Sequence, residues 1–384
     1  MASRQLAVKL SVSPSRGLVD EKLAILVKSA PPGARLTLRA FHQCENGHGW
    51  EAFAHYLTDA AGSLNVSEDP SLGGTYSGVE QMGLLWSIRP VPGSKPGLRM
   101  RKMNVQTPME FTISVYQDHI TDFTDQVPQA SQLVERWYMA PGILRTPITD
   151  CGLSATLFLP SGPGPFPAIL DLWGGGGQLV EYRAALFASH GFAALALDYM
   201  TPKITVETGK MVDNTYFEPR CAVCISGSHV QPVDGTVADI LSYFDRNAHK
   251  TQLNDENQAI MRNLLLPIPT DPAFKVDVGC VQCPLLVVVG EDDQNWPASE
   301  SAEDMKEMME RAGNVYLLTV LSYPNAGHLL EPPYSPHTRV SSFRSIGSRQ
   351  KLTALWGGES AAHSLAQEDA WKKTLDFLRH HLYT

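Results

Sequence analysis

Three apolar runs in the second half of the chain each lead into a loop of glycine or polar residues. The runs cover residues 167–170, 285–289 and 316–321, and the loops beyond them contain Gly174–Gly177, Asp293 and His328. A glycine loop can turn backbone N–H groups towards an oxyanion, and a carboxylate can orient a histidine that acts as a general base. Polar groups that follow buried strands in this way predict an α/β domain with an active site at the ends of its strands.

The order of these loops along the chain is that of an α/β-hydrolase: the oxyanion loop, then the acid, then the histidine. It predicts an oxyanion loop at Gly174, Gly175 and Gly176, with Asp293 or its neighbour Asp292 as the catalytic acid and His328 as the catalytic base. The glycines lack the G-x-G-x-x-G spacing of a dinucleotide site, and no cofactor is expected.

The nucleophile of an α/β-hydrolase lies between the oxyanion loop and the acid, at a tight strand-to-helix turn with small residues two positions to either side. Ala222 and Ser226 flank Cys224 in this manner, so Cys224 is the candidate nucleophile, and a buried strand thiol is the alternative. Pro232 and Gly235 disfavour the helix that should follow such a turn. The sequence therefore offers a candidate nucleophile but not the helix that is expected to follow it.

Length and charge exclude several classes of protein. With 384 residues the chain is long enough for two domains, and its net charge of −9 argues against nucleic acid as a partner. No apolar stretch reaches the ~20 residues that span a bilayer, and the first residues lack the apolar core of a signal peptide. We therefore expect a cytoplasmic protein. The peroxisome is the alternative, although His381–Thr384 contains no peroxisomal tripeptide.

Four of the six cysteines form two C-x-x-C pairs, Cys221/Cys224 and Cys280/Cys283. A four-thiolate zinc site would need both pairs. The pairs lie far apart in the sequence, however, and Cys283 directly precedes a strand that must enter the sheet. Unrelated thiols are the preferred interpretation, and no metal site is predicted.

The pattern of apolar residues divides the chain into two domains. Residues 1–140 alternate with a period of two between Gly and Pro turns, which predicts a β-sandwich without a catalytic constellation. Residues 141–384 alternate strands with helices, which predicts a mostly parallel sheet. The expected helices cover residues 180–190, 298–312 and 368–382.

Motifs in both domains carry a resemblance to a known family. They are Gly73–Gly78, Met82–Trp86, Gly164–Pro167, Glu181–Ala184, Gly290–Trp296, Gly327–Tyr334, Trp356–Glu359 and Ala366–Lys372. In these residues the chain resembles the type I acyl-CoA thioesterase and bile acid-CoA:amino acid N-acyltransferase family over nearly its whole length. The resemblance implies a β-sandwich followed by an α/β-hydrolase domain, and acyl-CoA substrates. It also implies that Asp293, rather than Asp292, is the acid.

The same resemblance implies a segment that this chain lacks. In the family, a Ser or Cys nucleophile follows a helix that begins near a Tyr-Phe-Glu motif, which is Tyr216–Glu218 here. Pro219 follows at once, and residues 219–228 resemble the strand beyond the elbow helix. The absent helix, strand, elbow and second helix would need on the order of 35–40 residues. The hydrolase domain is therefore expected to be incomplete.

Several functions follow from this resemblance. The first is an acyl-CoA thioesterase that hydrolyses fatty acyl-CoA to a fatty acid and CoA through an acyl-enzyme, if a nucleophile is present. The others are an impaired relative that binds acyl-CoA or a partner, an acyl-CoA:amino acid N-acyltransferase, and a product whose sheet cannot close. The acyl chain length, the acceptor and the oligomeric state are left open.

Overall fold

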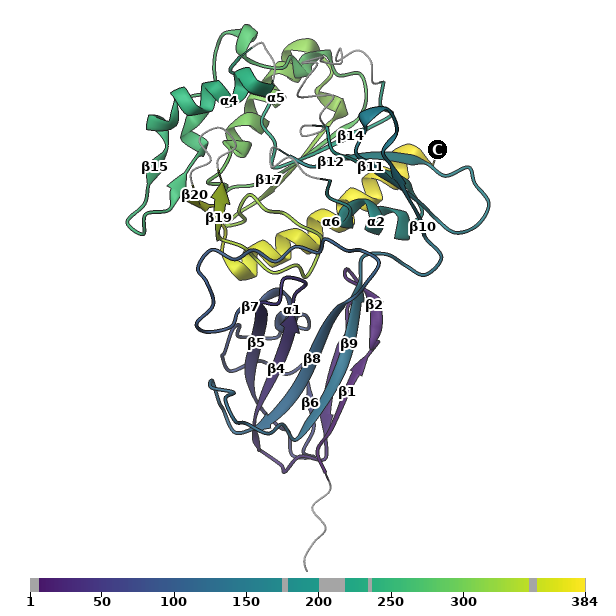
Figure 1. Cartoon of the computed structure of the whole chain (residues 1–384), viewed down its shortest axis with the longest axis vertical. Coiled ribbons are helices and arrows are strands. Elements are labelled where there is room, and N and C mark those ends of the chain that lie inside the picture. The colour runs from purple at the N-terminus through teal and green to yellow at the C-terminus, as the bar shows by residue number, and fades with distance from the viewer. Residues whose placement is uncertain (1–6, 175–178, 200–217, 234–236, 345–350, 384) are drawn as a thin grey trace, which may run out of the picture. The chain divides into compact units, whose positions relative to one another are not determined.

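The computed structural model describes residues 7–174, 179–199, 218–233, 237–344 and 351–383 (Figure 1). The chain divides into two compact units: the first comprises residues 1–95, 100–141 and 333–337, and the second comprises residues 96–99, 142–332 and 338–384. The predicted break after residue 140 lies beside this division. Among the described residues, none of the helices combines the length and the apolar character needed to cross a bilayer.

The first unit is a β-sandwich, as the alternating apolar residues predict. The smaller sheet has the order β1 (Lys9–Ser13), β3 (Ala24–Lys28), β6 (Leu64–Asn65). The larger sheet has the order β2 (Arg16–Leu18), β9 (Ala130–Trp137), β8 (Met109–Gln117), β4 (Arg35–Gln43), β5 (Gly49–Leu57), β7 (Arg89–Pro90). The short helix α1 spans Gly83–Trp86. Val27, Leu38 and Ile113 are completely buried in this unit.

The second unit contains three separate sheets in its described residues (Figure 1). The first has the order β10 (Leu144–Ile148), β11 (Ala155–Leu159), β13 (Ala193–Leu197), β12 (Ala168–Leu172). The second is parallel and has the order β14 (Ala222–Ile225), β17 (Leu285–Gly290), β18 (Leu318–Tyr323). The third has the order β15 (Gln252–Leu253), β16 (Ala259–Ile260), β20 (Lys351–Leu355), β19 (Val340–Arg344).

The helices of this unit are α2 (Tyr182–Ser189), α4 (Val237–Arg246), α5 (Ala298–Ala312) and α6 (Ser360–Leu382). Helices α5 and α6 cover opposite faces of β17. Val287 packs beneath Met305 and Met309 of α5, whereas Val288 packs against Ala370 of α6. Successive strand residues point to opposite faces, which is why β17 is buried along its whole length.

The hydrolase-type sheet is interrupted. Strand β12 is the last strand of one sheet and β14 is the first strand of the next, and among the described residues neither edge has a further partner. Strand β12 pairs with β13 in parallel, and β14 pairs with β17 in parallel. Along the chain, the point between Glu218 and Pro219, where the elbow segment is expected to be absent, directly precedes β14.

Candidate active site

Two neighbouring parallel strands deliver the acid and the histidine to the same edge of the sheet. Strand β17 ends at Gly290, three residues before Asp293, and β18 ends at Tyr323, five residues before His328. Asp293 Oδ2 lies 2.8 Å from His328 Nδ1. The two side chains are therefore within hydrogen-bonding distance, as their positions beyond buried strands predict.

The Asp293 carboxylate is held by its own loop. Its Oδ1 atom accepts the backbone N–H groups of Asn295 at 2.8 Å and Trp296 at 2.9 Å, which leaves Oδ2 for the histidine. The residue is 1% exposed. A buried carboxylate fixed in this way can orient an imidazole and stabilise its protonated form.

The imidazole of His328 is fixed on two sides. It stacks on Trp356 with ring centroids 5.6 Å apart, and Asn295 Nδ2 lies 3.2 Å from its Nε2 atom. When Nδ1–H donates to Asp293, Nε2 carries the lone pair and accepts from the Asn295 amide. In the described part of the chain, therefore, an amide meets the nitrogen that would face a nucleophile in a complete triad.

His363 braces the loop that carries His328. Its Nδ1 atom accepts the backbone N–H of Gly327 at 3.0 Å, and its Nε2 atom lies 2.9 Å from the Leu329 carbonyl oxygen. These contacts clamp the residues on either side of His328 to α6. No sequence motif singled out His363, because its partners are backbone atoms distant in the sequence.

Asp292, the alternative candidate for the catalytic acid, makes different contacts. Its Oδ2 atom accepts the backbone N–H of Gly358 at 2.7 Å and lies 3.2 Å from Arg339 Nη1, while its Oδ1 atom accepts from Gln294. These contacts tie the acid loop to the turn that follows Trp356. The geometry therefore pairs Asp293 with the histidine and leaves Asp292 as a loop anchor.

Gly290 allows the acid loop and the histidine loop to touch. A Cβ atom on Gly290 would lie 2.5 Å from the Ala326 carbonyl oxygen and 2.6 Å from that of Gly327. Both are backbone atoms that cannot turn aside, so the loops can approach this closely only at a glycine.

We expect Gly290→Ala to lower the free energy of unfolding by about 1–3 kcal/mol, because the added methyl group overpacks two backbone segments. Thermal unfolding of the purified protein measures the change. Gly174→Ala is the matched control, since nothing lies within 4 Å of a Cβ atom there. Equal unfolding temperatures for the two variants would contradict the close contact.

Cys224 does not have the position of an elbow nucleophile. It lies inside β14 and pairs with Val287, and its side chain packs with the apolar cluster beneath α5. Burial raises the pKa of its thiol, whereas a nucleophilic cysteine needs a lowered pKa. The structure therefore favours the alternative interpretation, a buried strand thiol.

The serines beyond β14 do not replace it. Ser226 has a positive φ of 51°, as a tight turn after a strand can require, but its Oγ atom is buried and has no hydrogen-bond partner among the described residues. The hydroxyl of Ser228 pairs with that of Ser301 at 2.9 Å. Neither hydroxyl contacts His328.

The oxyanion loop is described only at its beginning. Gly174 is exposed, whereas Gly175 and Gly176 lie outside the described residues. Arg183 of α2 anchors the approach to this loop: its Nε donates to Asp171 at 2.7 Å, its Nη2 donates to the Leu172 carbonyl at 3.0 Å, and its guanidinium lies 5.2 Å from the Trp173 ring centre.

The cysteine pairs show no metal-binding geometry in the described chain. Cys221, Cys224, Cys280 and Cys283 are free thiols, and no group of three or more His, Cys, Asp or Glu side chains converges there. Burial raises the pKa of Cys221 to about 11, and the nearby Cys283 contributes to the shift. The Cys221 thiol is therefore protonated near neutral pH.

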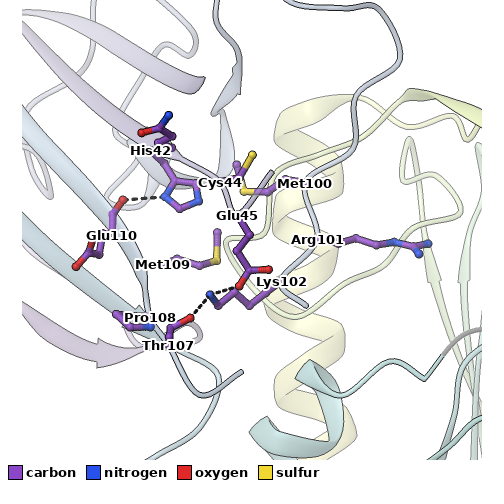
Figure 2. A pocket seen from close by; sticks show the side chains of 11 residues that line it. His42, Cys44, Glu45, Met100, Arg101, Lys102, Thr107, Pro108, Met109 and Glu110 are labelled. Carbon is purple, nitrogen blue, oxygen red and sulfur yellow. Dashed lines mark hydrogen bonds and ion pairs between the residues drawn. The ribbon is translucent and has the colours of Figure 1, made fainter. Parts of the chain in front are cut away.

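A pocket in the β-sandwich was not indicated by the sequence. It has a volume of about 330 Å³ and is lined by residues that include His42, Lys102 and Met109 (Figure 2). Lys102 Nζ pairs with Glu45 and donates to Thr107, and His42 Nδ1 lies 2.8 Å from the Glu110 carbonyl oxygen. Lys102 and His42 thus have separate hydrogen-bond partners and do not form a second acid–base pair.

Comparison with known proteins gives matches along almost the whole chain. Residues 20–150 match the acyl-CoA thioester hydrolase/BAAT N-terminal region, and residues 204–384 match the BAAT/acyl-CoA thioester hydrolase C-terminal family. The peroxisomal succinyl-coenzyme A thioesterase of Mus musculus is 34% identical over 420 positions, covering 98% of this chain and 97% of that protein. The acyl-coenzyme A amino acid N-acyltransferase 2 of Mus musculus is 32% identical and covers 98% of both chains.

The alignment with the mouse thioesterase is longer than this chain. It spans 420 positions against 384 residues, so at least 36 positions are filled by the relative alone. The mitochondrial acyl-coenzyme A thioesterase 2 of Homo sapiens, 32% identical over 423 positions, covers 98% of this chain and 85% of that protein. An esterase of the bacterial hormone-sensitive lipase family, known from a crystal structure, is 16% identical with a TM-score of 0.33, over 64% of this chain and 86% of the esterase.

Proposed function

Because the chain belongs to the acyl-CoA thioester hydrolase/BAAT family, we propose that it binds acyl-CoA and hydrolyses it only slowly, with His328 acting on water. One observation carries this proposal. His328 has its acid partner at 2.8 Å, but the polar group on its Nε2 atom is the Asn295 amide rather than a Ser or Cys side chain in the described chain. An acid–base pair that has no nucleophile beside it among the described residues supports general-base catalysis and not covalent catalysis.

The reaction uses Nε2 of His328 as the base. A water molecule takes the place of the Asn295 amide, loses a proton to Nε2 and attacks the thioester carbonyl carbon. The C–S bond then breaks, and the CoA thiolate takes the proton from the imidazolium, so that a free acid and CoA result. Asp293 stabilises the imidazolium through Nδ1–H, and the loop that begins at Gly174 supplies backbone N–H groups to the oxyanion.

An amine is the alternative acceptor. Of the three relatives described above, one is named as an amino acid N-acyltransferase and two are named as thioesterases. His328 could deprotonate either water or an amine, so its geometry does not favour one of them. The same assay with an amino acid such as glycine as the added acceptor separates hydrolysis from transfer.

We expect hydrolysis of a long-chain acyl-CoA to run roughly 10³-fold or more below that of an intact relative, because the covalent step is missing. Thiol release from the purified protein measures the rate. His328→Ala should remove the remaining activity, and Cys224→Ala should leave it unchanged. Rapid hydrolysis that Cys224→Ala abolishes would show that the elbow has been rebuilt at Cys224 and would overturn the proposal.

The cellular location stays a prediction. One relative is named as a peroxisomal and another as a mitochondrial protein, and a cytoplasmic location rests on the sequence pattern of this chain alone.

A further inference from the structure

One face of the sheet formed by β10, β11, β13 and β12 carries uncovered leucines. Leu170 and Leu172 of β12 are 40% and 44% exposed. In the sheet register they lie beside Leu195 and Leu197 of β13, which are half-buried. The side chains of such a row share one face, so the four leucines form a contiguous apolar patch.

The opposite face of the same strands is covered. Asp171 of β12 is buried and pairs with Arg183 of α2, and Ala194 and Ala196 of β13 are completely buried. This sheet is therefore covered by a helix on one face and uncovered on the other. By contrast, strand β17 of the sheet β14-β17-β18 has a helix on each face.

The uncovered leucines adjoin an unpaired strand edge. Strand β12 is both the strand with the exposed leucines and an edge of its sheet among the described residues, and β14 is an edge of another sheet. Each edge belongs to a parallel pair. An added strand that continues both parallel pairs needs helical crossovers rather than a hairpin.

We propose that this gap and leucine patch bind a strand-and-helix segment supplied in trans by a longer member of the same family. The mouse thioesterase fills at least 36 alignment positions that this chain does not. That length accommodates a strand of about 5–6 residues and a helix of about 11–12. The strand would pair with β12 and β14, and the helix would cover Leu170 and Leu172.

A second copy of this chain does not fit this site as well. It lacks the same segment and offers the same exposed edge and face, so pairing two copies leaves the interruption in each sheet. A segment from a longer relative has the required length, because that relative fills at least 36 alignment positions that this chain does not.

Direct binding tests the proposal. The probe is a fluorescent peptide made of the longest run in the mouse thioesterase that has no counterpart in this chain, with a scrambled peptide of the same composition as its control. Fluorescence anisotropy should show saturable binding of the probe and not of the scrambled peptide. Leu172→Asp should weaken binding at least tenfold, because it places a charge on the patch.

Leu133→Asp is the matched variant. Leu133 lies on β9 of the β-sandwich and is 51% exposed, so the substitution adds the same charge at a similar exposure away from the patch. It should leave binding unchanged. Equal binding by both variants, or by the scrambled peptide, would overturn the proposal, as would a stable dimer of the chain that the peptide does not dissociate.

The binding result is independent of the proposed hydrolysis. Anisotropy reports the peptide complex whether or not acyl-CoA is turned over, and the thiol-release assay needs no peptide. Peptide binding without any hydrolysis would support the proposed peptide site and contradict the proposed function. Slow hydrolysis without peptide binding would support the proposed function and contradict the peptide site.

Discussion

Inserting the absent family segment between Glu218 and Pro219 is expected to raise thioester hydrolysis by on the order of 10³-fold or more. The insert is the longest run of the mouse thioesterase without a counterpart here, and at least 36 positions of that alignment are available for it. The gain has a physical cause. Asp293 and His328 already form the acid–base pair, so a correctly placed Ser or Cys would complete a covalent mechanism.

Two variants of the extended chain isolate the cause of the gain. In one, the Ser or Cys of the inserted elbow is replaced by Ala; in the other, His328 is replaced by Ala. The first should return the rate to that of the unextended chain, measured by thiol release. The second should lower it below that rate, because His328 is the base with or without the inserted nucleophile. An extended protein that folds cooperatively and gains no activity would contradict either the site of insertion or the assignment of Asp293 and His328.

The sequence predicted the strands and helices with the strongest periodicity, because such patterns survive tertiary packing. The helix expected over residues 298–312 is α5 at the same residues. The helix expected over residues 180–190 is α2, and Gly191 just beyond it has a φ of 98°, as a residue that ends a helix often does. Helix α6 begins at Ser360 instead of residue 368. Its first two turns bury His363 and Gln367, and such polar side chains do not produce an apolar stripe.

The expected parallel sheet is only partly parallel. Strand β11 is antiparallel to both β10 and β13. Strand direction depends on which strands become neighbours, and a single strand's pattern of apolar residues does not carry that information. The parallel pair formed by β17 and β18 positions the candidate site.

The candidate site was predictable where it depends on strand ends and not where it depends on loops. Asp293 and His328 follow strands, so their proximity could be inferred. Asn295, Trp356 and His363 act on His328 or its loop from positions fixed by tertiary contacts. Cys224 illustrates the opposite problem: small residues at ±2 also occur inside an ordinary buried strand.

Asp171→Ala is expected to lower the free energy of unfolding by about 3–5 kcal/mol, because it leaves the Arg183 guanidinium buried without its carboxylate. The side chains of Asp171 and Arg183 are 6% and 16% exposed, and Arg183 Nε donates to Asp171 Oδ1 at 2.7 Å. For a unit of this size the change corresponds to a fall in Tm on the order of 10 °C, measurable by calorimetry.

Two further variants test whether the loss comes from the unpaired charge. Glu310→Ala removes one partner of the exposed Lys306–Glu310 pair and should cost less than about 0.5 kcal/mol. The double variant Asp171→Ala/Arg183→Ala removes both buried charges, so its cost should be well below the sum of the two single substitutions. Additive costs would mean that the two side chains stabilise the β12 end separately. In that case the approach to the oxyanion loop would be held by the Arg183 contacts with Leu172 and Trp173 rather than by the ion pair.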